Sequence, residues 1–336
     1  MLHDAYRKRL LFTRFFIFLL IGVMPASNIL ASHHKGQIAY TSKRAGNHEI
    51  YVADPDGVNR IRLTHHAADD AHPSWSPDGG RIAFISNRNG GSYQIYVMDS
   101  NGKNLRRLTQ GPRDWFPAWS PDGQTIAFEG FGDVEPYLKI HAVAPDGTNW
   151  RRLGADISSS DSHPTWSPDS RRIAYESWRD GERADIYVMD AGGRHLSRLT
   201  FTDVSERQPA WSPSGEKIAF CSTGIEDPES SDFDIFVMDA DGKNRKRLTD
   251  NEREDWHPAW SPDGNTIAFE HWRKVSLKSE LHLMTADGLY LTPLSDSHRG
   301  TDYAPDWFGP AGLSVSSVGS QPTIWGELKE FGAGLR

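Results

Sequence analysis

Residues 72–79 read His-Pro-Ser-Trp-Ser-Pro-Asp-Gly, and versions of this stretch recur along the whole chain. It returns as Phe-Pro-Ala-Trp-Ser-Pro-Asp-Gly at 116–123 and, in a weaker form, as Ala-Pro-Asp-Trp-Phe-Gly-Pro at 304–310. The copies centre on tryptophans spaced 44 to 49 residues apart, namely Trp75, Trp119, Trp166, Trp211, Trp260 and Trp307. A fixed period of this length predicts a stacked or radial array of repeated units.

Each repeat reads as four short strands. In the repeat that begins at residue 72, the first strand ends in the Trp-Ser-Pro-Asp-Gly turn, and apolar runs follow at 81–85, 94–99 and 105–109. The runs are rich in β-branched and aromatic residues and are bounded by Gly, Pro, Asn and Asp, which is typical of strands joined by tight turns. Four antiparallel strands per repeat predict the blade of a β-propeller.

The repeats also predict how the propeller closes. Units made of the second to fourth strands begin near Gln37 and number six, while the tryptophan-bearing first strands also number six but are offset by one unit. We therefore predict an all-β, six-bladed β-propeller of four-stranded antiparallel blades over residues 36–310. The strand around Trp307 is expected to pair with the N-terminal blade, because this pairing removes two open edges. A closed propeller of this kind is expected to be a monomer.

The N-terminus has the features of an export signal. Arg7, Lys8, Arg9 and Arg14 precede an apolar segment at 15–24, and small residues follow as far as Ala31. The apolar segment is shorter than the roughly 20 residues that span a membrane. We predict a signal peptide over 1–31, no membrane span after its cleavage, and a protein exported to the periplasm or out of the cell. Residues 311–336 follow the last repeat and are interpreted as a C-terminal tail.

Charge and cysteine content limit the function classes. The chain has a net charge of −8, and residues after the predicted signal carry about −11. This balance argues against binding to nucleic acid or to anionic lipid, both of which favour a basic face. The only cysteine, Cys221, stands in an apolar strand pattern and is interpreted as core.

The repeat resembles a known family. Pro-x-Trp-Ser-Pro-Asp-Gly, followed by Ile-Ala-Phe, Ile-Tyr-Val-Met-Asp and Arg-Leu-Thr, is similar to the WD40-like (PD40) repeat of TolB-like propellers. The resemblance covers nearly all of 36–310 and implies a six-bladed propeller. It also implies a TolB-like role, since TolB is a periplasmic protein of the Tol–Pal envelope system that binds protein partners. TolB itself carries an α/β domain before its propeller, and no such domain stands between residue 31 and the first strand here.

An acidic residue stands three positions before the proline of every copy. Related positions of a propeller lie on a ring, so six carboxylates around a channel mouth are a candidate site for Ca²⁺ or a basic peptide. The alternative is local, with each carboxylate accepting a backbone N–H at the start of its strand. The residues are Asp70, Asp114, Asp161, Glu206, Asp255 and Asp302.

Three histidines stand directly before the repeat proline. His72, His163 and His257 belong to alternate repeats, so propeller symmetry would place them around the axis. Three imidazoles can hold a transition metal when their nitrogens converge on one ion. The alternative is that these histidines are polar residues that line the channel.

Large aromatic residues in the loops form a third candidate site. They are Trp115, Trp256, Tyr303, Trp178 and Trp272, and the last two directly precede arginines. Exposed Trp and Tyr beside Arg are typical anchors for a partner, although packing between loops is the competing interpretation.

The enzyme interpretations are weaker. The chain has no Gly-x-Ser-x-Gly pentapeptide, which a prolyl-oligopeptidase-like hydrolase would carry. Oligogalacturonate lyases resemble a bare propeller of this repeat and use a histidine-rich metal site, so a metal-dependent polysaccharide lyase is the alternative function. We predict a non-catalytic, exported scaffold that binds a protein or peptide partner, TolB-like and possibly in the cell envelope.

Overall fold

A computed structural model describes the part of the chain that contains the repeats. The predicted signal peptide at 1–31 and the predicted tail at 311–336 lie outside the described residues. The structure describes residues 36–131, 136–154, 158–223, 232–251, 253–273, 276–289, 291–295 and 300–309.

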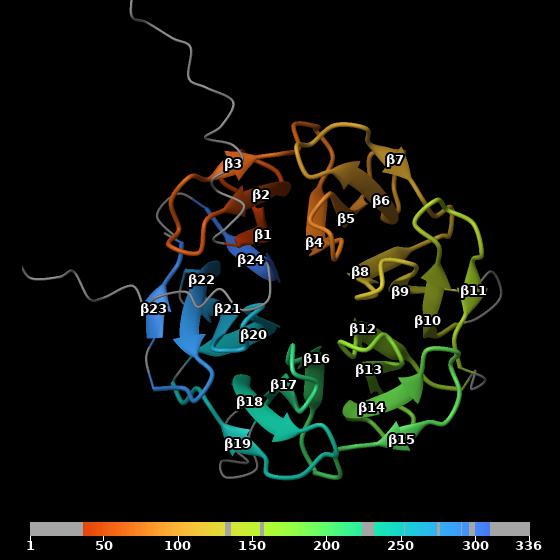
Figure 1. Ribbon diagram of the computed structural model, residues 1–336, viewed down its shortest axis with the longest axis vertical. Coiled ribbons are helices and arrows are strands. Elements are labelled where there is room, and N and C mark those ends of the chain that lie inside the picture. The colour runs from red at the N-terminus through yellow and green to blue at the C-terminus, as the bar shows by residue number, and fades with distance from the viewer. Residues whose placement is uncertain are drawn as a thin grey trace, which may run out of the picture. The chain divides into compact units, whose positions relative to one another are not determined.

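The described residues form six four-stranded antiparallel sheets arranged around a central axis (Figure 1). This arrangement confirms the predicted six-bladed propeller. In each sheet the tryptophan-bearing strand lies nearest the axis and the shortest strand lies outermost. The first sheet contains β24 (Asp302–Phe308), β1 (Gln37–Ser42), β2 (Glu49–Ala53) and β3 (Ile61–Arg62).

The other five sheets are continuous in sequence, and we name each by its first and last strand. They contain β4 (Asp70–Trp75), β5 (Arg81–Ser86), β6 (Gln94–Asp99) and β7 (Arg106–Arg107); β8 (Asp114–Trp119), β9 (Ile126–Phe131), β10 (Leu138–Val143) and β11 (Arg151–Arg152); β12 (Asp161–Trp166), β13 (Arg172–Ser177), β14 (Asp185–Asp190) and β15 (Ser197–Arg198); β16 (Glu206–Trp211), β17 (Lys217–Ser222), β18 (Asp234–Asp239) and β19 (Lys246–Arg247); β20 (Glu254–Trp260), β21 (Thr266–Arg273), β22 (Lys278–Thr285) and β23 (Leu291–Pro293).

The first sheet joins the two ends of the repeat region. β24 pairs antiparallel with β1, with Gln37 opposite Phe308 and Ile38 opposite Trp307. The innermost strand of this sheet therefore comes from the C-terminal side of the repeats. The pairing satisfies the backbone edge of β1, which would otherwise be free to pair with another chain.

The repeated Ser-Pro-Asp-Gly sequence forms the turn between the first and second strands. The Ser76 hydroxyl donates to Asp78 Oδ1 at 2.5 Å and accepts the backbone N–H of Arg81 at 2.8 Å. Asp78 Oδ1 also accepts the backbone N–H of Gly80 at 3.0 Å. Gly79 has a φ of 66°, a backbone conformation that favours glycine. The Ser, Asp and Gly of the repeat therefore each have a role in forming this turn.

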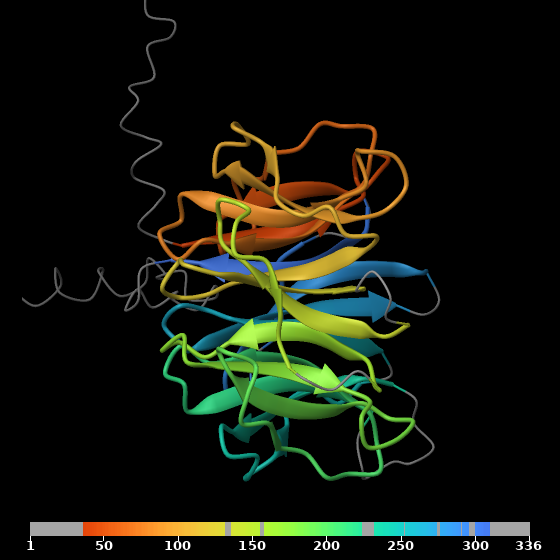
Figure 2. The ribbon, with the colours of Figure 1, turned by 90° about the vertical axis from the view of Figure 1, so that its right-hand side faces the viewer.

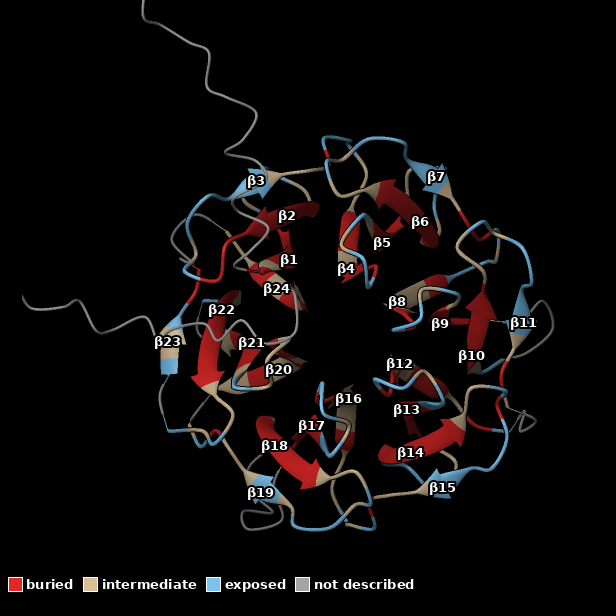
Figure 3. Ribbon diagram, in the orientation of Figure 1, coloured by how far each residue is buried: buried red, intermediate tan, exposed pale blue. Residues whose placement is uncertain are grey.

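The hydrophobic core lies between neighbouring sheets, which face one another around the axis (Figure 2). Trp75 and Phe84 of one sheet, for example, pack against Ile50 and Val52 of the sheet before it. Figure 3 shows the consequence, with buried inner strands and exposed outermost strands. Each sheet thus depends on both neighbours for the burial of its two faces.

We predict that ending the chain after Gly300 abolishes the cooperative fold. This truncation removes β24, exposes the edge of β1 and deletes Trp307, whose burial against Tyr40 and Leu283 alone stabilises the fold by roughly 3–5 kcal/mol. Size-exclusion chromatography and urea unfolding should show aggregation and loss of a single transition. A chain that ends after Pro310 keeps β24 and is the matched control. A stable monomer with an unchanged unfolding midpoint after the shorter truncation would contradict the prediction.

Candidate functional site

A bulge in every inner strand places one side chain at the axis. The register shifts between the second and fifth residues of β4, and equivalent shifts occur in the other inner strands. The residue before each proline has a φ between 47° and 52°, which is unusual for any residue other than glycine and more so before proline. We call these six residues the axial ring: His72, Phe116, His163, Gln208, His257 and Ala304.

The axial ring lines a cavity of about 170 Å³. A second cavity, of about 340 Å³, is lined by the Trp-Ser-Pro segments of the same inner strands. Both cavities contact the residue that directly precedes each tryptophan, such as Ser74 and Asp306, so they follow one another along the axis. The axial ring therefore stands at one end of the channel and the tryptophans stand nearer the other.

The three histidines predicted from the sequence do come together in this ring. The ring centroid of His257 lies 5.5 Å from that of His72 and 6.2 Å from that of His163. Phe116 packs among them, with its centroid 4.3 Å from His72 and 3.7 Å from His163. The group is a packed aromatic cluster, which agrees with the interpretation of the histidines as channel-lining residues.

Gln208 connects two of these histidines. The backbone N–H of His257 donates to Gln208 Oε1 at 2.8 Å, which turns the amide nitrogen of Gln208 toward the imidazoles. That nitrogen lies 3.1 Å from His257 Nε2 and 3.4 Å from His163 Nε2. Because an amide nitrogen only donates, both Nε2 atoms accept and each Nδ1 carries the proton. His163 Nδ1 then donates to Glu176 at 3.0 Å, and His257 Nδ1 to Glu270 at 2.8 Å.

The backbone N–H groups at four of the six bulges donate to a side chain of the preceding sheet. His72 N donates to Thr41 Oγ1 at 2.9 Å, and Gln208 N donates to Glu176 Oε2 at 2.8 Å. Glu129 accepts the N–H of His163 in the same way, at 3.2 Å. These three acceptors, Thr41, Glu129 and Glu176, occupy one position of the second strand, where the other sheets carry Ile85, Cys221 and Glu270.

Burial dominates the electrostatics of the channel. It lowers the pKa of His72 well below its usual value, and the nearby His257 and His163 lower it further. Burial also acts to lower the pKa of His163, but Glu176 and Glu129 outweigh it and raise that pKa. Asp306 is the carboxylate that lines both cavities, and burial raises its pKa to about 6.

The geometry does not favour the metal site predicted from His72, His163 and His257. Within the described residues, no group of three or more His, Cys, Asp or Glu side chains is arranged to hold a metal ion. The physical reason lies in the packing, since Phe116 contacts two of the imidazoles and the amide of Gln208 lies between two Nε2 atoms.

The six predicted acidic residues are buried within the blades and are not among the residues that line the two cavities. Asp70 accepts two hydrogen bonds from Arg88, at 2.7 and 2.8 Å, and Asp161 pairs with Arg179 at 3.1 Å. The other ion pairs and hydrogen bonds of this set join Asp302 to Arg44, Glu206 to Arg245, and Asp255 to His271. Asp114 instead accepts hydrogen bonds from Thr109 and from the backbone N–H of Gly111, and the charge of Arg107 also acts on it. Their role in binding Ca²⁺ or a peptide stays a prediction.

The predicted aromatic residues lie beside the axial ring. Trp115, Trp256 and Tyr303 directly precede ring residues, and all are half-buried. The ring centroid of Trp256 lies 4.1 Å from that of Phe233, and Tyr303 lies 5.4 Å from His72. Trp178 directly follows β13, Trp272 is the penultimate residue of β21, and both are half-buried. These residues therefore surround the same end of the channel.

Sequence reasoning missed the role of Gln208. Its position in the repeat is occupied by His, Phe and Ala in other copies, so the residue type gave no signal. The signal that could have found it is Cys221, which stands where two neighbouring repeats carry the acceptors Glu176 and Glu270. A repeat without that acceptor needs another one, and the side chain of Gln208 supplies it.

We predict that Gln208→Leu lowers the free energy of unfolding by about 1–3 kcal/mol. The substitution removes the acceptor for the His257 N–H and the donor to two imidazoles, and buried polar groups without partners are costly. Urea unfolding of the two proteins measures the difference. The matched control is Gln124→Leu at an exposed turn, which should change stability by less than about 0.5 kcal/mol. Equal effects of the two substitutions would contradict the connecting role of Gln208.

Comparison with known proteins places this geometry in a family. A family model described as the TolB beta propeller domain matches residues 32–116 and 114–229. The Tol-Pal system protein TolB of Actinobacillus succinogenes is 44% identical over 54 residues, which are 16% of this chain and 13% of that protein. TolB of Bordetella pertussis is 44% identical over 50 residues, 15% of this chain and 11% of the relative. The alignments thus span a small part of these relatives.

Solved structures show the same fold. TolB from Acinetobacter baumannii superposes with a TM-score of 0.68 at 23% identity, covering 83% of this chain and 68% of the other. A putative TolB from Agrobacterium tumefaciens gives 0.63 at 22% identity, covering 82% and 99%. At these identities the likeness supports the fold alone. The family model, however, matches more than half of the sequence, and the chain therefore belongs to the family of TolB β-propeller domains.

Proposed function

We propose that this protein is a non-catalytic, exported scaffold that binds a protein or peptide partner at the end of the propeller where the axial ring lies. One observation carries the proposal. Half-buried aromatic side chains and arginines stand together around that end of the channel. Such combinations are enriched among the residues that anchor protein interfaces.

The strongest group of this kind involves three sheets. The Arg207 guanidinium lies 5.4 Å from the ring centroid of Trp178 and 5.5 Å from that of Phe233, and Phe233 in turn stacks near Trp256. In a smaller group at the start of β8, the guanidinium of Arg113, which directly precedes the strand, lies 5.9 Å from the Trp115 ring. The rigid sheets hold these side chains in fixed positions, so a partner would bind with little loss of conformational freedom.

The family supports a partner and a location in the cell envelope. The relatives are named as Tol-Pal system proteins, and we propose by analogy that this chain acts in the periplasm or outside the cell. Residues 1–31 would then act as the export signal, 36–310 as the binding module and 311–336 as a tail. None of the described residues forms a helix with the length and hydropathy needed to cross a membrane. No observation favours the lyase alternative, so we do not propose it.

The proposal predicts that aromatic residues at the axial-ring end are needed for partner capture. Trp256→Ala and Trp115→Ala should each reduce capture of a specific envelope protein by at least about tenfold, because truncating an interface anchor costs roughly 2 kcal/mol or more. The measurement is affinity capture with the tagged protein, identification by mass spectrometry, and titration with the purified partner.

The matched control for these variants is Phe201→Ala. Phe201 is an exposed aromatic residue beside Arg198 at the outer edge of another sheet, so its removal should leave capture unchanged. Thermal unfolding must show that all three variants remain folded. If the two tryptophan variants capture the partner as well as the wild type does, the binding surface lies elsewhere and this proposal fails.

A further inference from the structure

One position along the channel carries a charge in a single sheet. In every sheet, the residue between the repeat proline and the repeat tryptophan lines both cavities. We call these six residues the middle ring: Ser74, Ala118, Thr165, Ala210, Ala259 and Asp306. The first five are small and neutral, and Asp306 is the only ionisable member of the ring.

Asp306 has a structural role that a neutral side chain could fill. β24 lies beside β4 near the axis (Figure 1), and Asp306 Oδ2 accepts the backbone N–H of Trp75 at 2.6 Å. Between the next two sheets, the hydroxyl of Ser74 accepts the backbone N–H of Trp119 in the same way, at 3.2 Å. This contact therefore does not require the negative charge of Asp306.

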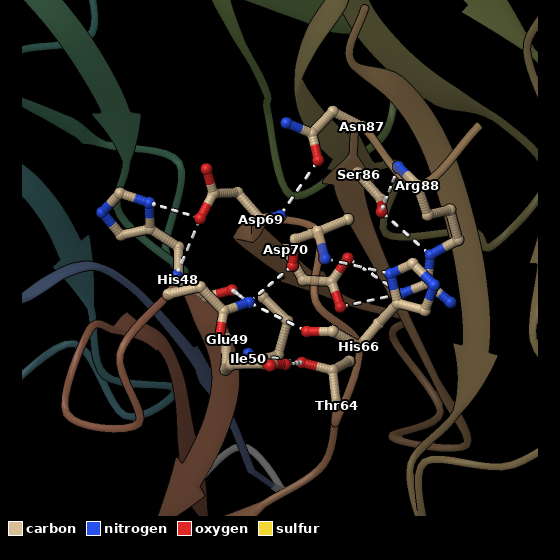
Figure 4. Close-up of polar contacts among 12 residues, drawn as sticks. His48, Glu49, Ile50, Thr64, His66, Asp69, Asp70, Ser86, Asn87 and Arg88 are labelled. Carbon is tan, nitrogen blue, oxygen red and sulfur yellow. Dashed lines mark hydrogen bonds and ion pairs between the residues drawn. The ribbon is translucent and has the colours of Figure 1, made fainter. Parts of the chain in front are cut away.

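Asp306 also differs from Asp70, a carboxylate that lies inside a blade. Arg88 donates to both oxygens of Asp70 (Figure 4). The hydrogen bonds that act on Asp306 come from the backbone N–H groups of Trp75 and Trp307, and among the described residues no charged side chain acts on its pKa. A carboxylate without a cation of its own chain thus lines the middle of the channel.

The channel has room for a ligand beside Asp306. The two cavities have volumes of about 340 and 170 Å³, whereas one water molecule needs roughly 10–15 Å³. The larger cavity reaches the prolines of the repeat turns, and four of these prolines are exposed, namely Pro77, Pro121, Pro168 and Pro213. At the opposite end the side chains of the axial ring pack against one another. The proline end is therefore the wider way to Asp306.

We propose that the channel binds a primary ammonium group on an unbranched alkyl chain, which enters from the proline end and pairs with Asp306. A lysine side chain of a partner and a free alkylamine share this chemistry. An ammonium group has three N–H donors, and the hydroxyls of Ser74 and Thr165 are further acceptors in the same ring. The three alanines of the ring offer methyl groups to the alkyl chain. The inference does not rest on the proposed function, because that function concerns the other end of the channel.

Other cations match the middle ring less well. Ca²⁺ takes about six to eight oxygen ligands, whereas the side chains of this ring are one carboxylate, two hydroxyls and three methyl groups. A guanidinium pairs best with both oxygens of a carboxylate, and Asp306 Oδ2 already accepts the N–H of Trp75. A compact ammonium needs only one carboxylate oxygen, so it suits this site better than either alternative.

The charge of Asp306 sets the expected pH dependence. Burial raises its pKa to about 6, against two backbone hydrogen bonds that lower it. His72, His163 and His257 share the smaller cavity with Asp306, but none of them is among the described groups that act on this pKa. An alkylammonium stays protonated in this range, since its pKa is roughly 10. Only the ionised carboxylate pairs with it, so the affinity should rise roughly tenfold between pH 5 and pH 7.

The experiment is a calorimetric titration of the folded protein with N-acetyl-L-lysine methylamide at pH 7. We expect saturable binding of this probe and none of the norleucine analogue, which has the same alkyl chain without the ammonium. This comparison needs no variant and holds even if a substitution disturbs the fold. Pentylamine is the second probe. Tighter binding of the lysine derivative indicates a protein as the source of the ammonium, and tighter binding of pentylamine indicates a free alkylamine.

Two variants test the role of Asp306. Asp306→Asn keeps an acceptor for the Trp75 N–H but removes the charge, and it should weaken binding of the lysine probe at least about tenfold. Asp306→Ser repeats the arrangement at Ser74 and should have the same effect. The matched control is Asp203→Asn, which makes the same change of charge at an exposed residue that lines neither cavity, and it should leave binding unchanged.

Several results would overturn the inference. They are equal binding of the lysine and norleucine probes, no saturation with either amine, or full binding by both Asp306 variants. Ca²⁺ that binds more tightly than the amines, and is lost in Asp306→Asn, would instead assign the charge to a metal site. The proposed function is tested separately, because Asp306→Asn should leave partner capture unchanged and Trp256→Ala should leave amine binding unchanged.

Discussion

The structure depends on backbone hydrogen bonds that each inner strand cannot make within its own sheet. The bulge before every repeat proline turns one residue toward the axis and takes its N–H out of the sheet ladder. A buried N–H needs an acceptor, and the preceding sheet supplies it through Thr41, Glu129 or Glu176. Neighbouring sheets are therefore joined by specific polar contacts at the axis as well as by the apolar packing between their faces.

This constraint explains why different polar residues can serve the same position near the axis. Any side chain that accepts a hydrogen bond at the right distance can serve the bulge, so Thr and Glu exchange with each other. Where Cys221 replaces them, the side chain of Gln208 accepts the His257 N–H from within the axial ring. The Ser-Pro-Asp-Gly turn varies less, and its two substitutions keep the same roles. Ser214 replaces the aspartate and lies 3.1 Å from the Ser212 hydroxyl, and Ser170 replaces the glycine with a φ of 59°.

The repeat made the fold predictable, but not the direction of its polar side chains. Asp-Gly turns, alternating apolar strands and an offset of one strand were enough to predict six blades. The spacing of Asp70 and Asp161 was equally compatible with a ring around the channel and with a position inside the blade. The structure places them inside because Arg88 and Arg179 pair with them there. The three histidines were predicted to approach the axis, but the contacts of Phe116 and Gln208 depend on the bulge, which the sequence does not display.

The strand order of the first sheet has a consequence for how the chain folds. Gln37 pairs with Phe308, so the last ladder to form joins residues that lie far apart in sequence. Closing so long a loop costs entropy before the contacts compensate for it, and topologies of this kind fold slowly. Five sheets can form from local hairpins as the chain emerges, whereas the first must wait for β24. We therefore expect the pairing of β24 with β1 to be the rate-limiting last step of folding. The lifetime of the native protein should then be set by how often this pairing opens.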